Sequence, residues 1–189
     1  MKHLIAATAA CALVVGCATQ QPAMIGPATA FRLVSPGMAD NTMLAPKYAG
    51  NFAKNPNCTG QNVSPALQWS NPPPKTKSYA LIVDDQAGRN GLGVSHGVVY
   101  GIPADVTSFA EGELAGTPVK FVGGSSLLGV HYMGPCSPRA QAPHHYVFTL
   151  IATDLEPYAL KGGMKRDELL KALEGHGLNA ASLVLRFAQ

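Results

Sequence analysis

The stretch from residue 130 to residue 150, VHYMGPCSPRAQAPHHYVFTL, concentrates groups that can do chemistry. It holds three of the six histidines, one cysteine and two tyrosines. His144 and His145 open an apolar strand, where successive residues face opposite ways, so only one of them can point into a given pocket. Tyr146 shares a face with His144, which would set an imidazole beside a phenol. The ordinary alternative is a strand that starts with a surface histidine and a core tyrosine.

A further histidine and a pair of carboxylates lie in two other apolar segments. His96, inside VSHGVVYGIP, could simply be a satisfied core residue, but its neighbour Gly97 favours close approach of a ligand or a backbone. Asp84 and Asp85 end the segment SYALIVDD. One carboxylate should face solvent and the other a neighbouring strand end, where it could fix the tautomer of a histidine and favour its charged form. A hydrated turn pair is the alternative.

Other site chemistries find little support. His96, His144 and Asp85 could in principle bind zinc, but no short-range His-x-x-x-His or Cys-x-x-Cys spacing accompanies them. A serine hydrolase would need a Gly-x-Ser-x-Gly turn, and GGSSLLG is only a serine-rich loop. A phosphate-binding P-loop is absent from the sequence. We therefore expect no catalytic residue, no metal and no cofactor.

The elements that position these residues are predicted to be mainly strands. Gly (20 residues) and Pro (15 residues) are frequent, which is typical of a fold with many turns. The continuous apolar run of SYALIVDD predicts a strand buried on both faces. One helix is predicted in KRDELLKALEGHG, with a leucine stripe and Gly175 or Gly177 as its stop. The predicted strands lie in FRLVS, ALQWS, SYALIVDD, VSHGVVYGIP, HHYVFTLIATDL and ASLVLRF.

Bulk composition predicts one folded domain. The chain has 189 residues, of which 47% are hydrophobic and 13% charged, so it can bury a core. The formal net charge is +3, without a Lys/Arg-rich run. Nucleic-acid binding is therefore not expected.

The N-terminus is typical of an exported protein. Residues 1–16 have a basic start and a short apolar run, as in a secretory signal peptide. The junction VVGC resembles the lipobox of bacterial lipoproteins, so we expect cleavage before Cys17 and lipidation of that cysteine; a plain signal peptide is the alternative. Residues 17–30 would then be the lipidated cysteine and a flexible tether, and residues 31–189 the domain. We expect a lipid-anchored protein of the bacterial envelope, on the outer membrane facing the periplasm.

Two cysteines remain for the mature domain. Cys11 would leave with the signal peptide and Cys17 would carry lipid, which leaves Cys58 and Cys136 in an oxidising compartment. Such a pair favours a disulfide, and two unpaired buried thiols are the alternative.

Three motifs together resemble one family. NVSPALQWSNPPPKTKSYALIVDD, SHGVVYGIP and GPCSPRAQAPHHYVF occur in the order and spacing of the phosphatidylethanolamine-binding proteins, most like their bacterial Raf-kinase-inhibitor-like branch. The resemblance runs from about Phe31 to the C-terminus. It implies a mostly β fold, with a central antiparallel sheet packed on a smaller sheet and short peripheral helices. It also implies a small anion pocket at the sheet end, and binding rather than catalysis.

The resemblance also implies the site residues. Matched motif positions give the ligand-binding set Asp85, His96, Gly134, Cys136, Pro138, His144 and Tyr146. The acidic motif departs from the family pattern: Gln86 stands where a proline belongs, and a second Asp is missing before Ala87. With one carboxylate fewer, the pocket should be more positive and its histidines less strongly charged. His145 replaces a usual Arg and should face away, and His131 has no predicted role.

The leading functional hypothesis is an envelope lipoprotein that binds a phosphate-like anion or a phospholipid headgroup. One alternative is a protein-interaction or inhibitor module with a vestigial pocket, and another is a hydrolase. The expected partners are the small anionic ligand and the membrane, through the lipid anchor. A homodimer is implied by the resemblance alone.

Overall fold

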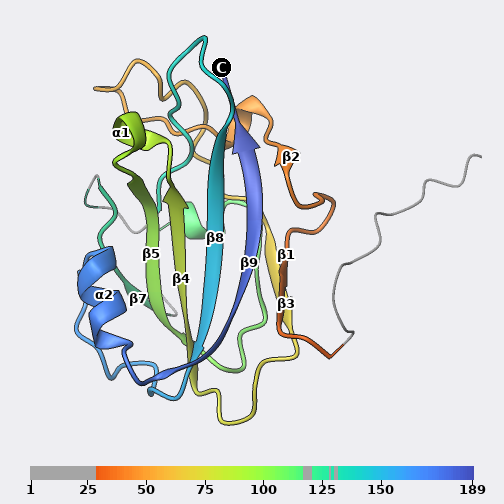
Figure 1. The fold of residues 1–189 in the computed structure, drawn as a ribbon, viewed down its shortest axis with the longest axis vertical. Coiled ribbons are helices and arrows are strands. Elements are labelled where there is room, and N and C mark those ends of the chain that lie inside the picture. The colour runs from red at the N-terminus through yellow and green to blue at the C-terminus, as the bar shows by residue number, and fades with distance from the viewer. Residues whose placement is uncertain (1–28, 117–120, 128, 130–131) are drawn as a thin grey trace, which may run out of the picture.

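The strands form two sheets of unequal size in the computed structural model, which describes residues 29–116, 121–127, 129 and 132–189. The larger sheet has the order β2 (Thr42–Met43), β9 (Gly177–Phe187), β8 (His144–Thr153), β4 (Ser78–Asp85), β5 (Val94–Pro103) and β7 (Val122–Gly123). The smaller sheet has the order β1 (Arg32–Val34), β3 (Leu67–Ser70) and β6 (Ser108–Phe109), and lies behind the larger one (Figure 1). The predicted mostly β fold with two sheets is confirmed. The parallel pairing of β2 with β9 is the exception to the expected antiparallel order.

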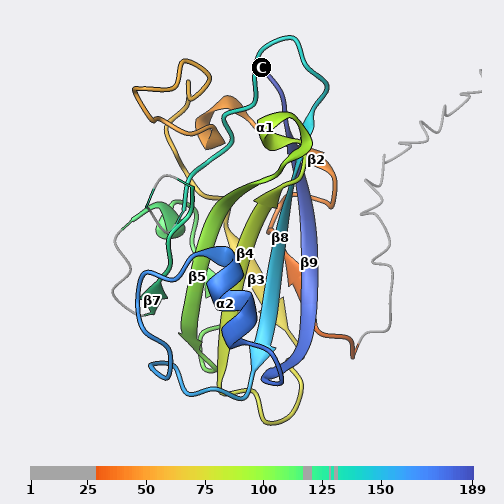
Figure 2. The same ribbon diagram turned by 60° about the vertical axis from the view of Figure 1, so that its left-hand side comes forward.

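Strand β4 is buried on both faces, as its apolar run predicted. Tyr79, Leu81 and Val83 belong to the main core, which they share with residues of the smaller sheet. Ala80 and Ile82 face the other way and pack in a second core with Leu169 of α2 (Arg166–Ala172) and its neighbours. Figure 2 shows α2 lying across this second face of the sheet.

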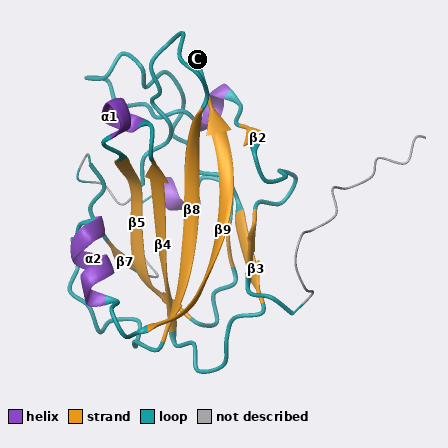
Figure 3. Ribbon diagram, viewed as in Figure 1, coloured by secondary structure: helices purple, strands orange, loops and turns teal. Residues whose placement is uncertain are grey.

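The helices are short and peripheral, as predicted (Figure 3). Besides α2 they are η1 (Pro46–Tyr48), η2 (Glu113–Ala115) and α1 (Gly88–Gly91). α1 is an irregular turn, because Arg89 and Asn90 have left-handed φ angles of 53° and 58°. α2 ends at Ala172, and Gly175, with a φ of +79°, reverses the chain before β9. No helix in the described ranges is long and apolar enough to cross a membrane.

The register of the larger sheet brings three strand termini together at one end of the sheet. Asp85, the last residue of β4, lies opposite Val94 at the start of β5. It also lies opposite Tyr146, near the start of β8. Because these neighbours run antiparallel, the end of β4 and the beginnings of β5 and β8 meet, and the histidines near those beginnings come together.

Candidate anion-binding site

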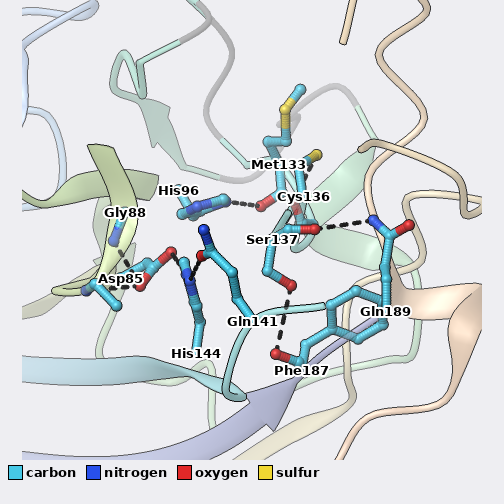
Figure 4. A network of polar contacts seen from close by, with 12 residues as sticks. Asp85, Gly88, His96, Met133, Cys136, Ser137, Gln141, His144, Phe187 and Gln189 are labelled. Carbon is cyan, nitrogen blue, oxygen red and sulfur yellow. Dashed lines mark hydrogen bonds and ion pairs between the residues drawn. The ribbon is translucent and has the colours of Figure 1, made fainter. Parts of the chain in front are cut away.

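A cavity of about 310 Å³ opens at this end of the larger sheet. Its walls come from the end of β4, α1, the start of β5 and the loops that precede β8 (Figure 4). Of the predicted site residues, the structure places Asp85, His96, Cys136, Pro138 and His144 on the cavity. Residues far apart in the sequence therefore converge on one small hole.

Asp85 is the acidic residue of the cavity. One carboxylate oxygen accepts hydrogen bonds from the backbone N–H groups of Ala87 (3.0 Å) and Gly88 (3.1 Å). The other accepts from Nδ1 of His144 at 2.7 Å. Asp84 faces the opposite side of the strand, where its carboxylate accepts from Nε of Arg166 at 2.8 Å. The pleat of β4 thus assigns Asp85, and not Asp84, to the site.

His144 is held between two acceptors. Its Nδ1 donates to Asp85, and its Nε2 lies 3.3 Å from Oε1 of Gln141. Both ring nitrogens of His144 therefore have polar partners. The Gln141 side chain reaches into the cavity mouth from its exposed loop (Figure 4). His145, next along the strand, is exposed, as predicted from strand alternation.

His96 is the second buried histidine of the cavity. Its Nδ1 lies 3.1 Å from the carbonyl oxygen of Met133. Burial lowers the pKa of His96 below its ordinary value of 6.5. The adjacent Gly97 accommodates a neighbouring strand and not a ligand, because a Cβ there would lie 2.8 Å from Cγ2 of Val83.

Tyr146 lies behind the cavity wall. The sequence placed its phenol beside His144 in the pocket, but the structure packs its ring edge-on against His96, with 5.0 Å between ring centroids. Tyr146 is fully buried and is not among the cavity residues. Burial raises the pKa of its hydroxyl, which finds no hydrogen-bond partner in the described structure. The phenol ring of Tyr146 therefore packs behind the cavity wall and against the ring of His96.

Gly134 has a structural position in the loop before β8. Gly134 was predicted to bind the ligand, but it does not line the cavity, and its backbone N–H donates to Oδ1 of Asn62 at 2.8 Å. A Cβ at this position would lie 2.2 Å from the carbonyl oxygen of Tyr48, so only glycine fits. The close packing of this loop explains why Gly134 supports the cavity without lining it.

A disulfide closes one side of the cavity. The structure joins Cys58 to Cys136, with their Cα atoms 4.6 Å apart. The bond ties the loop that carries Asn55 and Asn57, both on the cavity, to the loop before β8. The side-chain amide of Gln189 adds hydrogen bonds to the carbonyl oxygens of Asn57 and Ser137.

Several cavity residues were not found by sequence reasoning. Arg89 lines the cavity with a cationic side chain, and Ser126 brings a buried hydroxyl that has no hydrogen-bond partner among the described residues. Gln141 was not predicted either. Arg89 could have been predicted, because it follows Asp85 by only four residues, in the turn QAGRNGLG. His131 lies outside the described residues.

The described residues contain no cluster of three or more His, Cys, Asp or Glu side chains that could hold a metal ion. The polar side chains that line the cavity instead include histidine, carboxylate, guanidinium, amide and hydroxyl groups. Such a mixture suits a small polar ligand that carries negative charge.

Comparison with known proteins agrees with this architecture. Residues 34–188 match the family model described as phosphatidylethanolamine-binding protein. A UPF0098 protein of Methanothermobacter thermautotrophicus is 38% identical over 136 residues, which are 67% of this chain and 83% of that protein. The UPF0098 protein YbcL of Escherichia coli is 37% identical over 128 residues, which are 65% of this chain and 67% of YbcL.

Solved structures show the same fold. The crystal structure of Escherichia coli YbcL, described as a new member of the mammalian PEBP family, superposes with a TM-score of 0.74 at 27% identity, covering 84% of this chain and 98% of YbcL. CT736 of Chlamydia trachomatis superposes with a TM-score of 0.71 at 28% identity, covering 85% of this chain and 99% of CT736. The chain therefore belongs to the phosphatidylethanolamine-binding protein family.

Proposed function

We propose that this protein is a binding module that holds a small phosphate-like anion, free or as a phospholipid headgroup, in the cavity at the sheet edge. One observation carries the proposal: His144, His96, Arg89 and the hydroxyl of Ser126, which has no partner among the described residues, line one cavity of about 310 Å³. That volume lies near the lower end of small-molecule sites, which span about 300 to 1,000 Å³.

The anion would be held by donors from opposite sides of the cavity. Arg89 offers a permanently charged guanidinium, which binds phosphate oxygens well. Nε2 of His144 becomes available once the ligand displaces Gln141. The Asp85 carboxylate repels an anion weakly, because both of its oxygens already accept hydrogen bonds.

Titration of phosphate and phosphoethanolamine, followed by NMR of the backbone and histidine rings, tests the proposal. We expect saturable shifts at His96 and His144 and unchanged signals at His176, an exposed histidine whose Nδ1 pairs with Asp154. Arg89→Gln should weaken phosphate binding about three- to tenfold, since a guanidinium–phosphate contact is lost at an exposed mouth. Lys171→Gln on α2 removes the same charge away from the cavity and is the matched control. The proposal would be contradicted if neither cavity histidine shifted at ligand concentrations up to tens of millimolar. Any binding would then be weaker than about 2 to 3 kcal/mol.

The proposal includes attachment to the envelope. The VVGC junction supports cleavage before Cys17 and acylation of that residue, and two or more acyl chains give stable anchoring. The tether up to residue 30 would leave the domain at the periplasmic face of the outer membrane. Mass spectrometry of the N-terminal peptide from membrane fractions tests this part. Cys17→Ser should move the protein to the soluble fraction, and recovery of an unmodified Cys17 peptide would contradict it.

A second candidate is a protein-interaction module in which the cavity is unused. It is favoured by two large exposed apolar side chains: Leu127, which lines the cavity, and Leu92, which follows α1. The NMR titration separates the two functions, because this alternative requires no anion binding. The same surface could serve the homodimer that the family resemblance implied, and sedimentation of the wild type against Leu92→Ser measures that.

A hydrolase is the least supported candidate. Asp85 and His144 resemble the acid–base part of a catalytic triad, but Nε2 of His144 faces the amide of Gln141 and not a hydroxyl. An assay on esters and phosphoesters, with His144→Ala as the comparison, tests this alternative directly.

A further inference from the structure

We infer that the cavity selects oxyanions that carry a proton, such as hydrogen phosphate, over unprotonated anions of the same shape, such as sulfate, and that His96 makes the selection. The inference rests on the proposed anion-binding function. It adds a specificity that neither the family nor the cavity volume supplies.

The geometry of His96 defines which of its nitrogens can donate. Nδ1 lies 3.1 Å from the Met133 carbonyl oxygen, which can only accept a hydrogen bond. Nδ1 therefore carries the ring proton. The ring is 7% exposed, and its burial lowers the histidine pKa, so the second nitrogen stays unprotonated at neutral pH. A neutral imidazole with its proton on Nδ1 has a lone pair at Nε2 and is an acceptor there.

The packing around His96 keeps this state. Tyr146 of β8 packs edge-on against the ring at an interplanar angle of 82° and contributes no charge. Burial has the largest influence on the pKa of His96 and lowers it, although hydrogen bonds to the backbone and the carboxylates of Asp85 and Asp84 act to raise it. His96 therefore remains neutral at neutral pH.

The cavity thus contains both donors and an acceptor. Arg89 can only donate, and the hydroxyl of Ser126, which is 6% exposed and has no partner among the described residues, can donate or accept. Nε2 of His96 can only accept. An anion with an O–H group satisfies both sides, since its free oxygens accept from Arg89 and its proton reaches His96. Sulfate has no proton to offer at neutral pH and would set an oxygen lone pair against a nitrogen lone pair.

Hydrogen phosphate and sulfate form a matched pair of probes. At mildly alkaline pH both are tetrahedral dianions, and they differ in one proton. A buried acceptor left unpaired weakens binding about tenfold or more. Calorimetric titration of the wild-type protein with sodium phosphate and sodium sulfate, at equal ionic strength, should therefore show at least about tenfold tighter binding of phosphate.

A variant and a spectroscopic signature assign the selection to His96. His96→Gln replaces the bare nitrogen with an amide that can also donate, so its preference for phosphate should fall to about twofold. In the wild type, the ¹⁵N signal of Nε2 should be that of an unprotonated nitrogen, and it should shift upfield with phosphate but not with sulfate. If the variant does not fold, the wild-type titrations and the ¹⁵N signal decide the matter.

The outcomes separate this inference from the proposed function. Equal affinity for phosphate and sulfate, or a protonated Nε2 in the free protein, overturns the selection and leaves anion binding intact. Binding of neither anion overturns both.

Discussion

Strand β8 has a histidine–aspartate pair at each end, and the two pairs differ in burial and not in geometry. At its start, Nδ1 of His144 lies 2.7 Å from Asp85, and the two side chains are 7% and 4% exposed. Just beyond its end, Nδ1 of His176 lies 2.8 Å from Asp154, with side chains 44% and 43% exposed. About 30 Å of strand separates them.

The same histidine–aspartate contact therefore has different consequences in buried and exposed surroundings. Water competes with the exposed pair, which stabilises the fold little. At the buried pair, loss of one partner leaves an uncompensated charge. The cavity end is moreover cross-linked by the disulfide between Cys58 and Cys136. Substitutions at the cavity should therefore destabilise the fold strongly, whereas substitutions at the far end of β8 should have little effect.

Removal of the disulfide should have the largest effect. Cys58→Ser with Cys136→Ser should lower the free energy of unfolding by about 4 kcal/mol, because the bond closes a long loop of the unfolded chain. Its sequence separation is 78 residues. Chemical denaturation with and without reductant measures this. Reductant should destabilise the wild type and leave the double variant unchanged. If reductant does not change the stability of the wild type, the disulfide does not stabilise the cavity end of the molecule.

The two histidines themselves give the next largest difference. His144→Ala should lower the free energy of unfolding by about 3 kcal/mol, since it leaves the buried carboxylate of Asp85 without its partner. His176→Ala is the matched control and should cost less than about 0.5 kcal/mol. Both are measured by chemical denaturation at neutral pH. Equal losses in the two variants would mean that burial does not distinguish the pairs.

His96 predicts a smaller, pH-dependent effect. Because its pKa is lowered in the folded state, the unfolded chain binds the proton first as the pH falls below 6.5. Stability contributed by neutral His96 is thus present above that pH and is lost as the pH falls toward the folded-state pKa. The wild type should therefore lose stability on acidification that His96→Gln does not lose. Denaturation curves measured on both sides of that pH test it, and identical pH profiles would refute it.

Gln141 predicts the smallest effect. Its amide occupies Nε2 of His144, so a ligand must replace this hydrogen bond. Gln141→Ala should therefore tighten phosphate binding about threefold, in keeping with the modest net value of one hydrogen bond between a histidine and an amide. The same calorimetric titration measures it. Weaker binding in the variant would show that Gln141 is itself a ligand contact.

Local patterns predicted the fold well. The apolar run of β4 indicated burial on both faces, and the leucine stripe of α2 indicated a packed helix. These predictions succeed because strand alternation and helical periodicity record the burial of each segment directly. The pairing of β2 with β9 was not foreseen, since a strand of two residues carries no such pattern.

The site was predicted in part. Motif positions led to Asp85, His96 and His144, which do share one cavity. They also led to Tyr146 and Gly134, which the structure uses for packing behind the cavity. A motif marks that a residue is needed near a site, but not whether it faces the ligand or supports the wall.

The sequence by itself determined the longer strands, the family and the set of groups available for chemistry, because these depend on residue types and short-range order, whereas the two-residue strands β2, β6 and β7 were not predicted. Only the tertiary structure decided which carboxylate meets His144, which carbonyl holds His96 and which loops bring Arg89 and Ser126 to the same hole. Those choices depend on the register between strands and loops that are distant in the chain, and no local pattern encodes a distance between them.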